Sequence, residues 1–144
     1  MPDIDLNELA KSLYARRHEA VVVPYEAKTI VSGPPIERDC HRNTDRWVME
    51  HADHKAVRGW MVFDFNRTSE GLLPNCRFTA HSVVETPDGK LFDLTPAPHA
   101  SKRYPFLRHQ GSNGEFEAIV SAGHIVHLDF AVFANSVARI VTGR

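Results

Sequence analysis

One cysteine, one histidine and one aspartate of this chain have the types and the order that thiol chemistry requires. Cys40 lies in the polar stretch ERDCHRNTDRW, where a packing cysteine has little reason to be, and His81 and Asp93 lie in FTAHSVVETPDGKLFDLTP. A thiol becomes a nucleophile as its thiolate, a nearby imidazole can take the proton, and a carboxylate behind the imidazole fixes the ring. The three residues therefore predict nucleophilic catalysis, provided that the fold brings them together.

A predicted hairpin places the histidine and the aspartate on one face of a sheet. The segments RFTAHSVVE and KLFDLT have strand character and are joined by TPDG. Pro87 cannot adopt the positive φ of a type I′ turn, whereas a type I turn followed by Gly89 in a left-handed bulge suits the sequence. The resulting three-residue loop pairs Val84 with Phe92. Because side chains alternate along a strand, this register leaves the histidine and the aspartate within reach of each other.

The cysteine is predicted to begin a helix. Asp39 has the type of an N-cap residue, and the helix would run from there to about His54. One side of this segment carries a stripe of mainly apolar residues at helical spacing, and Cys40 lies at its first turn. A helix start carries partial positive charge and unpaired N–H groups, which favour a thiolate and can bind an oxyanion.

A cysteine at the start of a central helix, a histidine on a strand and an aspartate on the next strand, within HSVVETPDGKLFDLT, resemble the papain-like superfamily in its transglutaminase-like branch. The resemblance covers residues 39–96, about two-fifths of the chain. It implies an α+β fold in which the central helix packs on an antiparallel sheet, and a covalent thioester mechanism. In that mechanism Cys40 is the nucleophile, His81 the general base and acid, and Asp93 the orienting carboxylate.

The chain departs from the better-known members of that superfamily around the cysteine. Cys40 is not followed by tryptophan, and no glutamine precedes it as a second oxyanion donor, because the only glutamine is Gln110. Asn43 or a backbone group of residues 32–38 is the predicted substitute. Peptide bond, isopeptide, glutamine side chain and small amide all remain open as the group that is attacked.

Four residues are predicted to contact substrate. Asn43 would donate to the oxyanion, and Trp60, on the predicted strand VRGWMVFDF, would line a pocket, with a core position as its alternative. Lys102 and Arg103 lie in SKRYPFLRH, which follows Asp93 closely. A solvated loop is the alternative there to a basic rim that favours an acidic or carboxylate-bearing substrate.

Two rival functions stay open at this point. The first is a structural metal site, because Cys40, His41, Cys76 and His81 are zinc ligands by type, although their spacing matches none of the usual paired patterns. The second is a non-catalytic binding or regulatory domain of the same fold. For Asp93, the alternative role is a cap on the turn that follows it. We expect neither a metal nor a cofactor.

The composition is that of an ordinary globular chain. It has 144 residues, of which 42% are hydrophobic and 24% are charged, and its formal net charge is −1. This length fits a single domain over residues 1–144, and the balanced charge gives no general case for nucleic acid or an anionic membrane as partner. The start of the chain lacks a secretory signal pattern. We therefore expect a cytoplasmic protein that acts on a small amide or on a peptide or protein.

Further elements are predicted from periodicity and turn signals, and their order is typical of the α+β class. They are a helix over residues 6–17, two short strands broken at Pro24, a strand over 57–65, a hairpin of strands over 116–120 and 124–128, and either a helix or a strand over 129–139.

Overall fold

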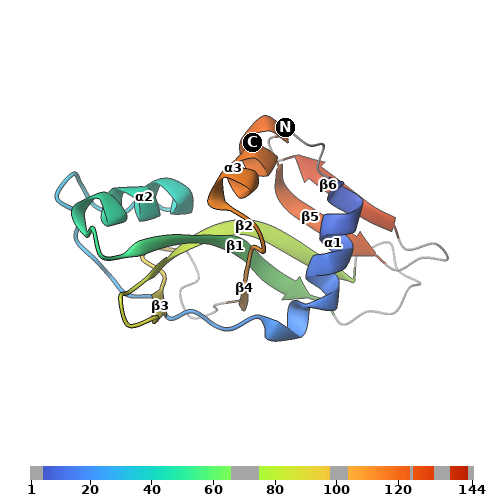
Figure 1. Cartoon of the computed structure of the whole chain (residues 1–144), viewed down its shortest axis with the longest axis horizontal. Helices are drawn as coiled ribbons and strands as arrows, with labels where there is room; N and C mark the ends of the chain where they lie inside the picture. Colours follow the sequence, from blue (N-terminus) through green and yellow to red (C-terminus); the bar gives the residue numbers. More distant parts are fainter. Residues whose placement is uncertain (1–4, 66–74, 98–103, 124, 132–136, 143–144) are drawn as a thin grey trace.

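The computed structural model describes residues 5–65, 75–97, 104–123, 125–131 and 137–142 (Figure 1). No helix within these ranges is long and apolar enough to cross a membrane. The elements follow one another as α1 (Leu6–Ala15), the short 3-10 helix η1 (Arg17–Glu19), α2 (Cys40–Glu50), β1 (Lys55–Asp64), β2 (Cys76–Glu85), β3 (Leu91–Phe92), β4 (Phe106–Arg108), α3 (Asn113–Gly123), β5 (Ile125–Ala131) and β6 (Val137–Thr142).

The frame of the molecule is a curled antiparallel sheet of six strands. The main path of the sheet has the order β4-β1-β2-β5-β6, and β3 pairs with β2 beside this path. The longest ladder joins β1 to β2, from Lys55 opposite Glu85 to Asp64 opposite Cys76. Figure 1 shows α2 and α3 over the same side of the β1–β2 ribbon and α1 beside β5 and β6. The expected α+β class, with a helix packed on an antiparallel sheet, is therefore confirmed.

Two of the apolar clusters hold the helices on the sheet. The larger cluster joins α1 and α3 to the sheet and contains the fully buried Trp60 and Phe78. The smaller one lies under α2, where Trp47 meets Val84 and Phe92. Burying a side chain of this size contributes about 1.5–3 kcal/mol. The position of α2, and with it the position of Cys40, is thus set by the buried face of the predicted hairpin.

The predicted hairpin register is confirmed. Val84 lies opposite Phe92, and Glu85 lies opposite Leu91. Gly89 adopts the left-handed conformation, with φ +84°, which a residue with a side chain rarely adopts. The turn chemistry of the sequence was therefore sufficient to fix which side chains of the two strands share a face.

The predicted strand over residues 116–120 is wrong, because this segment lies within the helix α3. Ser112 caps the helix: its hydroxyl accepts the backbone N–H of Glu115 at 3.0 Å. Phe116 and Ile119, three residues apart, both face the core. An apolar run of this length fits a strand or a helix by periodicity, and the N-terminal cap decides for the helix.

Three other segments also differ from expectation. The two strands predicted around Pro24 are absent from the described residues, where only the isolated bridges Val21–Phe106 and Tyr25–Asp93 occur. The predicted surface loop after Asp93 contains the short strand β4. Of the segment 129–139, the described parts belong to β5 and β6, so the strand alternative holds for these parts.

Candidate active site

His81 and Asp93 meet as the hairpin register predicts. Nε2 of His81 lies 2.6 Å from Oδ2 of Asp93. Both side chains are shielded from water, with exposed fractions of 12% and 4%. The second carboxylate oxygen, Oδ1, accepts the backbone N–H of Thr95 at 2.9 Å. One carboxylate thus combines the predicted contact with the imidazole and the turn-capping role that was its alternative, and both contacts fix its orientation.

The backbone of Asp93 is also anchored. Its N–H donates to the carbonyl of Pro24 at 2.9 Å, and its carbonyl accepts the N–H of Glu26 at 2.9 Å. The segment that leads toward α2 therefore runs beside the residue that holds the imidazole. This arrangement couples the position of the helix start to the position of the His81–Asp93 pair.

Cys40 is the first residue of α2, and its thiol is half-buried. The thiol contacts two imidazoles, those of His81 and His41. Because Nε2 of His81 is bonded to Asp93, the ring nitrogen that remains for the thiol is Nδ1. The histidine ring is therefore placed between a sulfur and a carboxylate, in the order that a thiol triad requires.

The electrostatics of Cys40 and His81 favour the charged form of each. Burial by itself raises the pKa of Cys40, but the hydrogen bonds and charges of His41 and His81 outweigh it and lower the pKa to about 6. Burial by itself lowers the pKa of His81, but the contacts with Asp93 and Cys40 raise it to about 10. At neutral pH the site therefore favours a thiolate beside an imidazolium.

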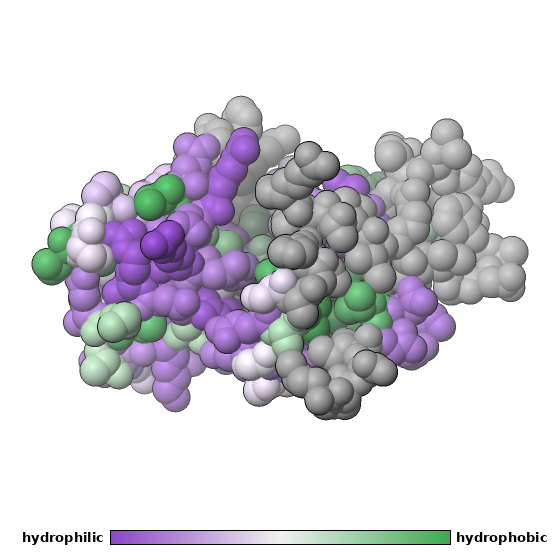
Figure 2. Space-filling model, turned by 90° about the horizontal axis from the view of Figure 1, so that it is seen from above, coloured by the Kyte–Doolittle hydropathy of each residue, from purple (hydrophilic) through white to green (hydrophobic). Residues whose placement is uncertain are grey.

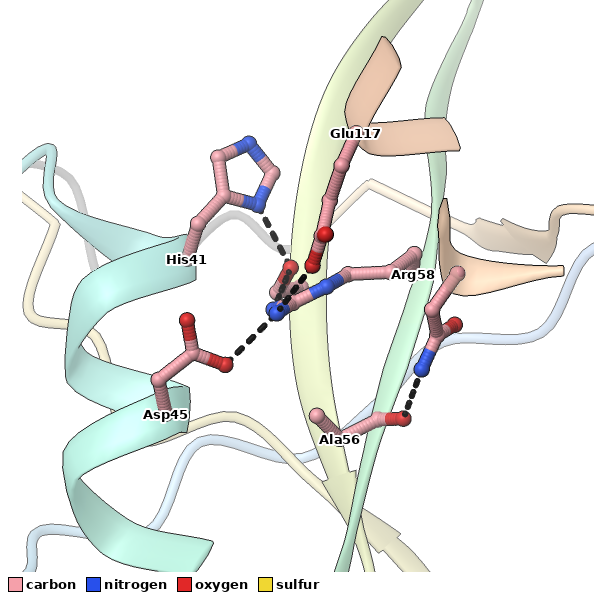
Figure 3. A network of polar contacts seen from close by, with 7 residues as sticks. His41, Asp45, Ala56, Arg58 and Glu117 are labelled. Carbon is pink, nitrogen blue, oxygen red and sulfur yellow. Dashed lines mark hydrogen bonds and ion pairs between the residues drawn. The ribbon is translucent and has the colours of Figure 1, made fainter. Parts of the chain in front are cut away.

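A chain of polar contacts starts at His41, the residue that follows Cys40, and the sequence did not predict it (Figure 3). Nδ1 of His41 is 2.5 Å from the hydroxyl oxygen of Ser82. That oxygen also accepts from Nη1 of Arg58 at 2.8 Å. Nη2 of Arg58 donates to Asp45 at 2.6 Å and to Glu117 at 3.2 Å. These contacts fix the ring of His41, the residue that follows Cys40.

Two features of the sequence point to this network of polar contacts. An arginine stands within the otherwise apolar strand VRGWMVF, and a buried arginine needs anionic partners. His41 and Asp45 are four residues apart, which places them on one face of a helix. The contact with Glu117 on α3 could not be found from helical spacing, because the segment that contains Glu117 was predicted to be a strand.

Asn43 is fully buried, and its amide is committed to the protein. It accepts from the backbone N–H of Ile36 at 2.9 Å, and its NH₂ group donates to the carbonyl of Ile36 at 2.7 Å and to the hydroxyl of Thr95 at 3.1 Å. These contacts clamp the turn before Cys40, in which Arg38 has a positive φ of 67°. The contacts favour a structural role for Asn43 over the predicted role in oxyanion binding.

The predicted substrate residue Trp60 lies in the core and not at the surface of the site. Trp60 is fully buried in the core, and its indole N–H donates to Nδ1 of His109 at 3.3 Å. It therefore takes its alternative role, as a core residue, and does not line an open pocket. Lys102 and Arg103 lie outside the residues that the structure describes.

The two cysteines are free thiols. Cys76 is fully buried at the start of β2. Within the described ranges, no group of three or more histidine, cysteine, aspartate or glutamate side chains could hold a metal ion. Comparison with protein-family models, with curated proteins and with solved structures finds no match for the chain.

Proposed function

We propose that the chain is a thiol-dependent acyl hydrolase or acyltransferase, with Cys40 as nucleophile, His81 as general acid and base, and Asp93 as the carboxylate that orients it. One observation carries the proposal: a single buried imidazole contacts both the thiol at a helix start and a carboxylate, at 2.6 Å from the latter. A histidine that served packing alone would not need a partner on both ring nitrogens.

The reaction begins with attack of the Cys40 thiolate on the carbonyl carbon of an amide or ester. A carbon–sulfur bond forms, and the carbonyl electron pair moves to oxygen. When the intermediate collapses, the bond to the leaving group breaks, and the His81 imidazolium gives its proton to the departing amine or alcohol. Neutral His81 then takes a proton from water or an amine, which attacks the thioester and regenerates the thiolate.

The oxyanion of each intermediate would be held at the start of α2. The first N–H groups of a helix have no partner inside the helix, and they carry its positive dipole end. The backbone N–H of Cys40 is the nearest of these donors to the attacked carbon. With the amide of Asn43 committed elsewhere, the side chain of His41 is the better candidate for a second donor, since it already contacts the thiol.

The likeness to the papain-like superfamily in its transglutaminase-like branch belongs to this proposal. Two features support it: the order of Cys40, His81 and Asp93 in the sequence, and their places at the start of α2, on β2 and directly after β3. It implies a thioester intermediate and a small amide, a peptide or a protein as the substrate.

An active ester tests the proposal without knowledge of the natural substrate. With 4-nitrophenyl acetate near neutral pH, we expect a rapid release of nitrophenolate, about stoichiometric with the protein, and an acetyl group on the Cys40 peptide by mass spectrometry. Cys40→Ser and His81→Gln should both lose the burst, while Cys76→Ala, a matched change of the other thiol, should keep it.

Acetylation that is spread over lysines, or that survives unchanged in His81→Gln, would contradict the proposal. The alternative of a non-catalytic binding domain would then stand, because a fold can keep such residues without the chemistry.

A further inference from the structure

A cavity of about 330 Å³ opens between α2 and α3. Neither Cys40 nor His81 belongs to its lining, but His41, the neighbour of the nucleophile, does. Figure 2 shows the described surface at this end of the molecule, over α2, as mainly hydrophilic. The lining combines aromatic, aliphatic and charged side chains: His41, Asp45, Arg58, Phe116, Glu117, Val120 and Ser121.

The accessible charge of this cavity is negative. Arg58 is almost completely covered, with 4% of its side chain exposed, whereas Asp45 and Glu117 are 53% and 56% exposed. Each carboxylate uses one oxygen to bind the guanidinium. Within the described residues, no other cation pairs with either of them. Two carboxylates against one guanidinium leave one negative charge in excess, and it faces solvent.

Arg58 also keeps an unsatisfied donor. Its Nε is buried and has no hydrogen-bond partner within the described residues. A buried N–H of this kind has a free-energy cost unless an acceptor reaches it. A carbonyl oxygen of a ligand would supply that acceptor, whereas an anionic ligand would have to displace a carboxylate that Arg58 already binds.

We propose that this cavity binds a cationic group of the substrate, an aliphatic chain that ends in an ammonium or guanidinium group. The inference rests on the proposed acyl-transfer function and names the class of substrate for it. Asp45 and Glu117 bind the cation, Phe116 and Val120 contact its aliphatic stem, and the reacting carbonyl extends past His41 to Cys40.

The geometry of α2 gives the spacing. Asp45 follows Cys40 by five residues, which is about 7.5 Å along a helix axis. An extended peptide covers that distance in about two residues. The cationic group should therefore be about two residues from the carbonyl that is attacked, as a basic side chain or a terminal amine.

The bound cation is an anchor and not the acceptor of the acyl group. An amine held between two carboxylates stays protonated, because opposite charges favour its charged form. A protonated amine has no lone pair with which to attack a thioester. The acceptor in the second half of the reaction must therefore come from another direction.

Direct binding tests the cavity independently of the thiol. Three probes are titrated into the wild-type protein, n-butylammonium as a side-chain analogue, glycinamide as a terminal-amine analogue and propionate as an anion. The readout is the NMR signal of the Arg58 Nε–H. We expect a saturable shift in the millimolar range with one of the two amines and none with propionate. Which amine binds identifies the source of the cation.

The matched variants are Asp45→Asn with Glu117→Gln, and Glu8→Gln on α1 as the control. The double variant should lose the amine-dependent shift, and Glu8→Gln should keep it. Saturable binding of propionate, or equal amine binding in the double variant, would overturn the proposal. Because both carboxylates are more than half exposed, the single variant Glu117→Gln provides a folded check if the double variant is unstable.

Thiol reagents that differ in charge test whether the carboxylates of the cavity affect the modification rate of Cys40. The thiolate attacks the sulfenyl sulfur of a methanethiosulfonate, a disulfide forms, and methanesulfinate leaves. We compare the 2-aminoethyl reagent, which is cationic, with the neutral methyl reagent, by mass spectrometry of the Cys40 peptide. The cationic-to-neutral rate ratio should fall about threefold for each carboxylate removed.

The two arms separate the two proposals. If every reagent modifies Cys40 slowly while amines still bind, the activated thiol is wrong and the cation site stands. If Cys40 reacts rapidly but amines neither bind nor gain a rate advantage, the acyl-transfer proposal stands and the cation site is wrong.

Discussion

The two thiols of this chain lie in regions that shift the pKa of a cysteine in opposite directions. Cys76 is fully buried in the apolar core at the start of β2, and there burial, followed by the charge of Asp64, raises its pKa to about 12. Cys40 is half-buried, and burial acts on its pKa in the same direction. Its pKa nevertheless falls to about 6, because two imidazoles contact the sulfur.

The difference shows that burial alone does not decide the pKa of a thiol. What decides it is which groups the fold places within hydrogen-bond distance of the sulfur. Cys76 belongs to the larger apolar cluster, and there the charge of Arg17 and a backbone hydrogen bond from Arg77 do not offset the effect of burial on its pKa. Around Cys40, the helix start and the hairpin bring His41 and His81 to the thiol. A single fold thus holds two thiols whose pKa values are shifted in opposite directions.

Among the changes that leave both Cys40 and His81 in place, the largest expected effect comes from the carboxylate behind the imidazole. Asp93→Asn keeps an acceptor for the N–H of Thr95 but removes the charge that supports the His81 imidazolium. The pKa of Cys40 should rise toward that of an ordinary thiol, and alkylation by iodoacetamide at pH 7 should slow by about 30-fold. The measurement is the alkylation rate of the Cys40 peptide.

Asp53→Asn, an exposed aspartate after α2, serves as the control and should keep the wild-type rate. If Asp93→Asn alkylates as fast as Asp53→Asn, the carboxylate does not support the imidazolium, and the contrast between the two thiols needs another cause.

The second largest effect is expected in the pH dependence of stability, to which the two thiols should contribute differently. The pKa of Cys40 is lower in the folded protein, about 6, than its ordinary value of 9.0. Its contribution to folding is therefore fully present above about pH 9 and is lost as pH falls through about 6. The stability difference between wild type and Cys40→Ala should rise by at least about 1.4 kcal/mol from pH 6 to pH 9, the equivalent of one pKa unit.

Urea unfolding at several pH values measures this difference. Cys76→Ala is the matched comparison, since the pKa of Cys76 is raised and its thiolate stabilises nothing in this range. A difference between wild type and Cys40→Ala that stays flat or falls from pH 6 to pH 9 would mean that Cys40 is a neutral thiol in the folded protein.

A smaller effect is expected from the second imidazole. His41→Gln removes one of the two contacts that lower the pKa of Cys40 but leaves His81 in place. We expect alkylation of Cys40 at pH 6 to be threefold to tenfold slower, which corresponds to a loss of about 1 kcal/mol of thiolate stabilisation. The inflection of the pH profile should shift to higher pH. His18→Gln, on the exposed 3-10 helix η1, should leave the profile unchanged. A shift of the same size in both variants would remove His41 from the account.

The smallest effect on reactivity is expected at the inert thiol. Cys76→Ala leaves a small void in the core and should lower the free energy of unfolding by about 1 kcal/mol. The alkylation profile of Cys40 should not change. If it does change, the two thiols are coupled through the sheet, and the comparison between separate regions fails.

The part of the site that the sequence predicted depends on local turn chemistry. Pro87 and Gly89 leave few conformations to the turn, so they fix the register, and the register in turn brings His81 to Asp93. The helix start at Cys40 follows from equally local signals, although Asp39 makes no side-chain hydrogen bond to the helix.

The part that the sequence did not predict depends on contacts between distant segments. Nothing near Arg58 in the sequence says that Ser82, Asp45 and Glu117 meet it. The helix α3 was missed although its signal is local: Ser112 and Glu115 have the spacing of a capping box, which outweighs the strand propensity of the residues that follow. For Trp60 the sequence left open a place in a substrate pocket, but the structure buries this side chain completely in the core.

The most direct test of the account is the pH profile of Cys40 alkylation by iodoacetamide, in the wild type and in His81→Ala, with the peptide identified by mass spectrometry. We expect half-maximal reactivity near pH 6 in the wild type, in line with the Cys40 pKa of about 6, and a shift to about pH 9 or above in His81→Ala. A wild-type profile that rises only near pH 9, or a profile that His81→Ala does not move, would show that Cys40 and His81 do not form an ion pair.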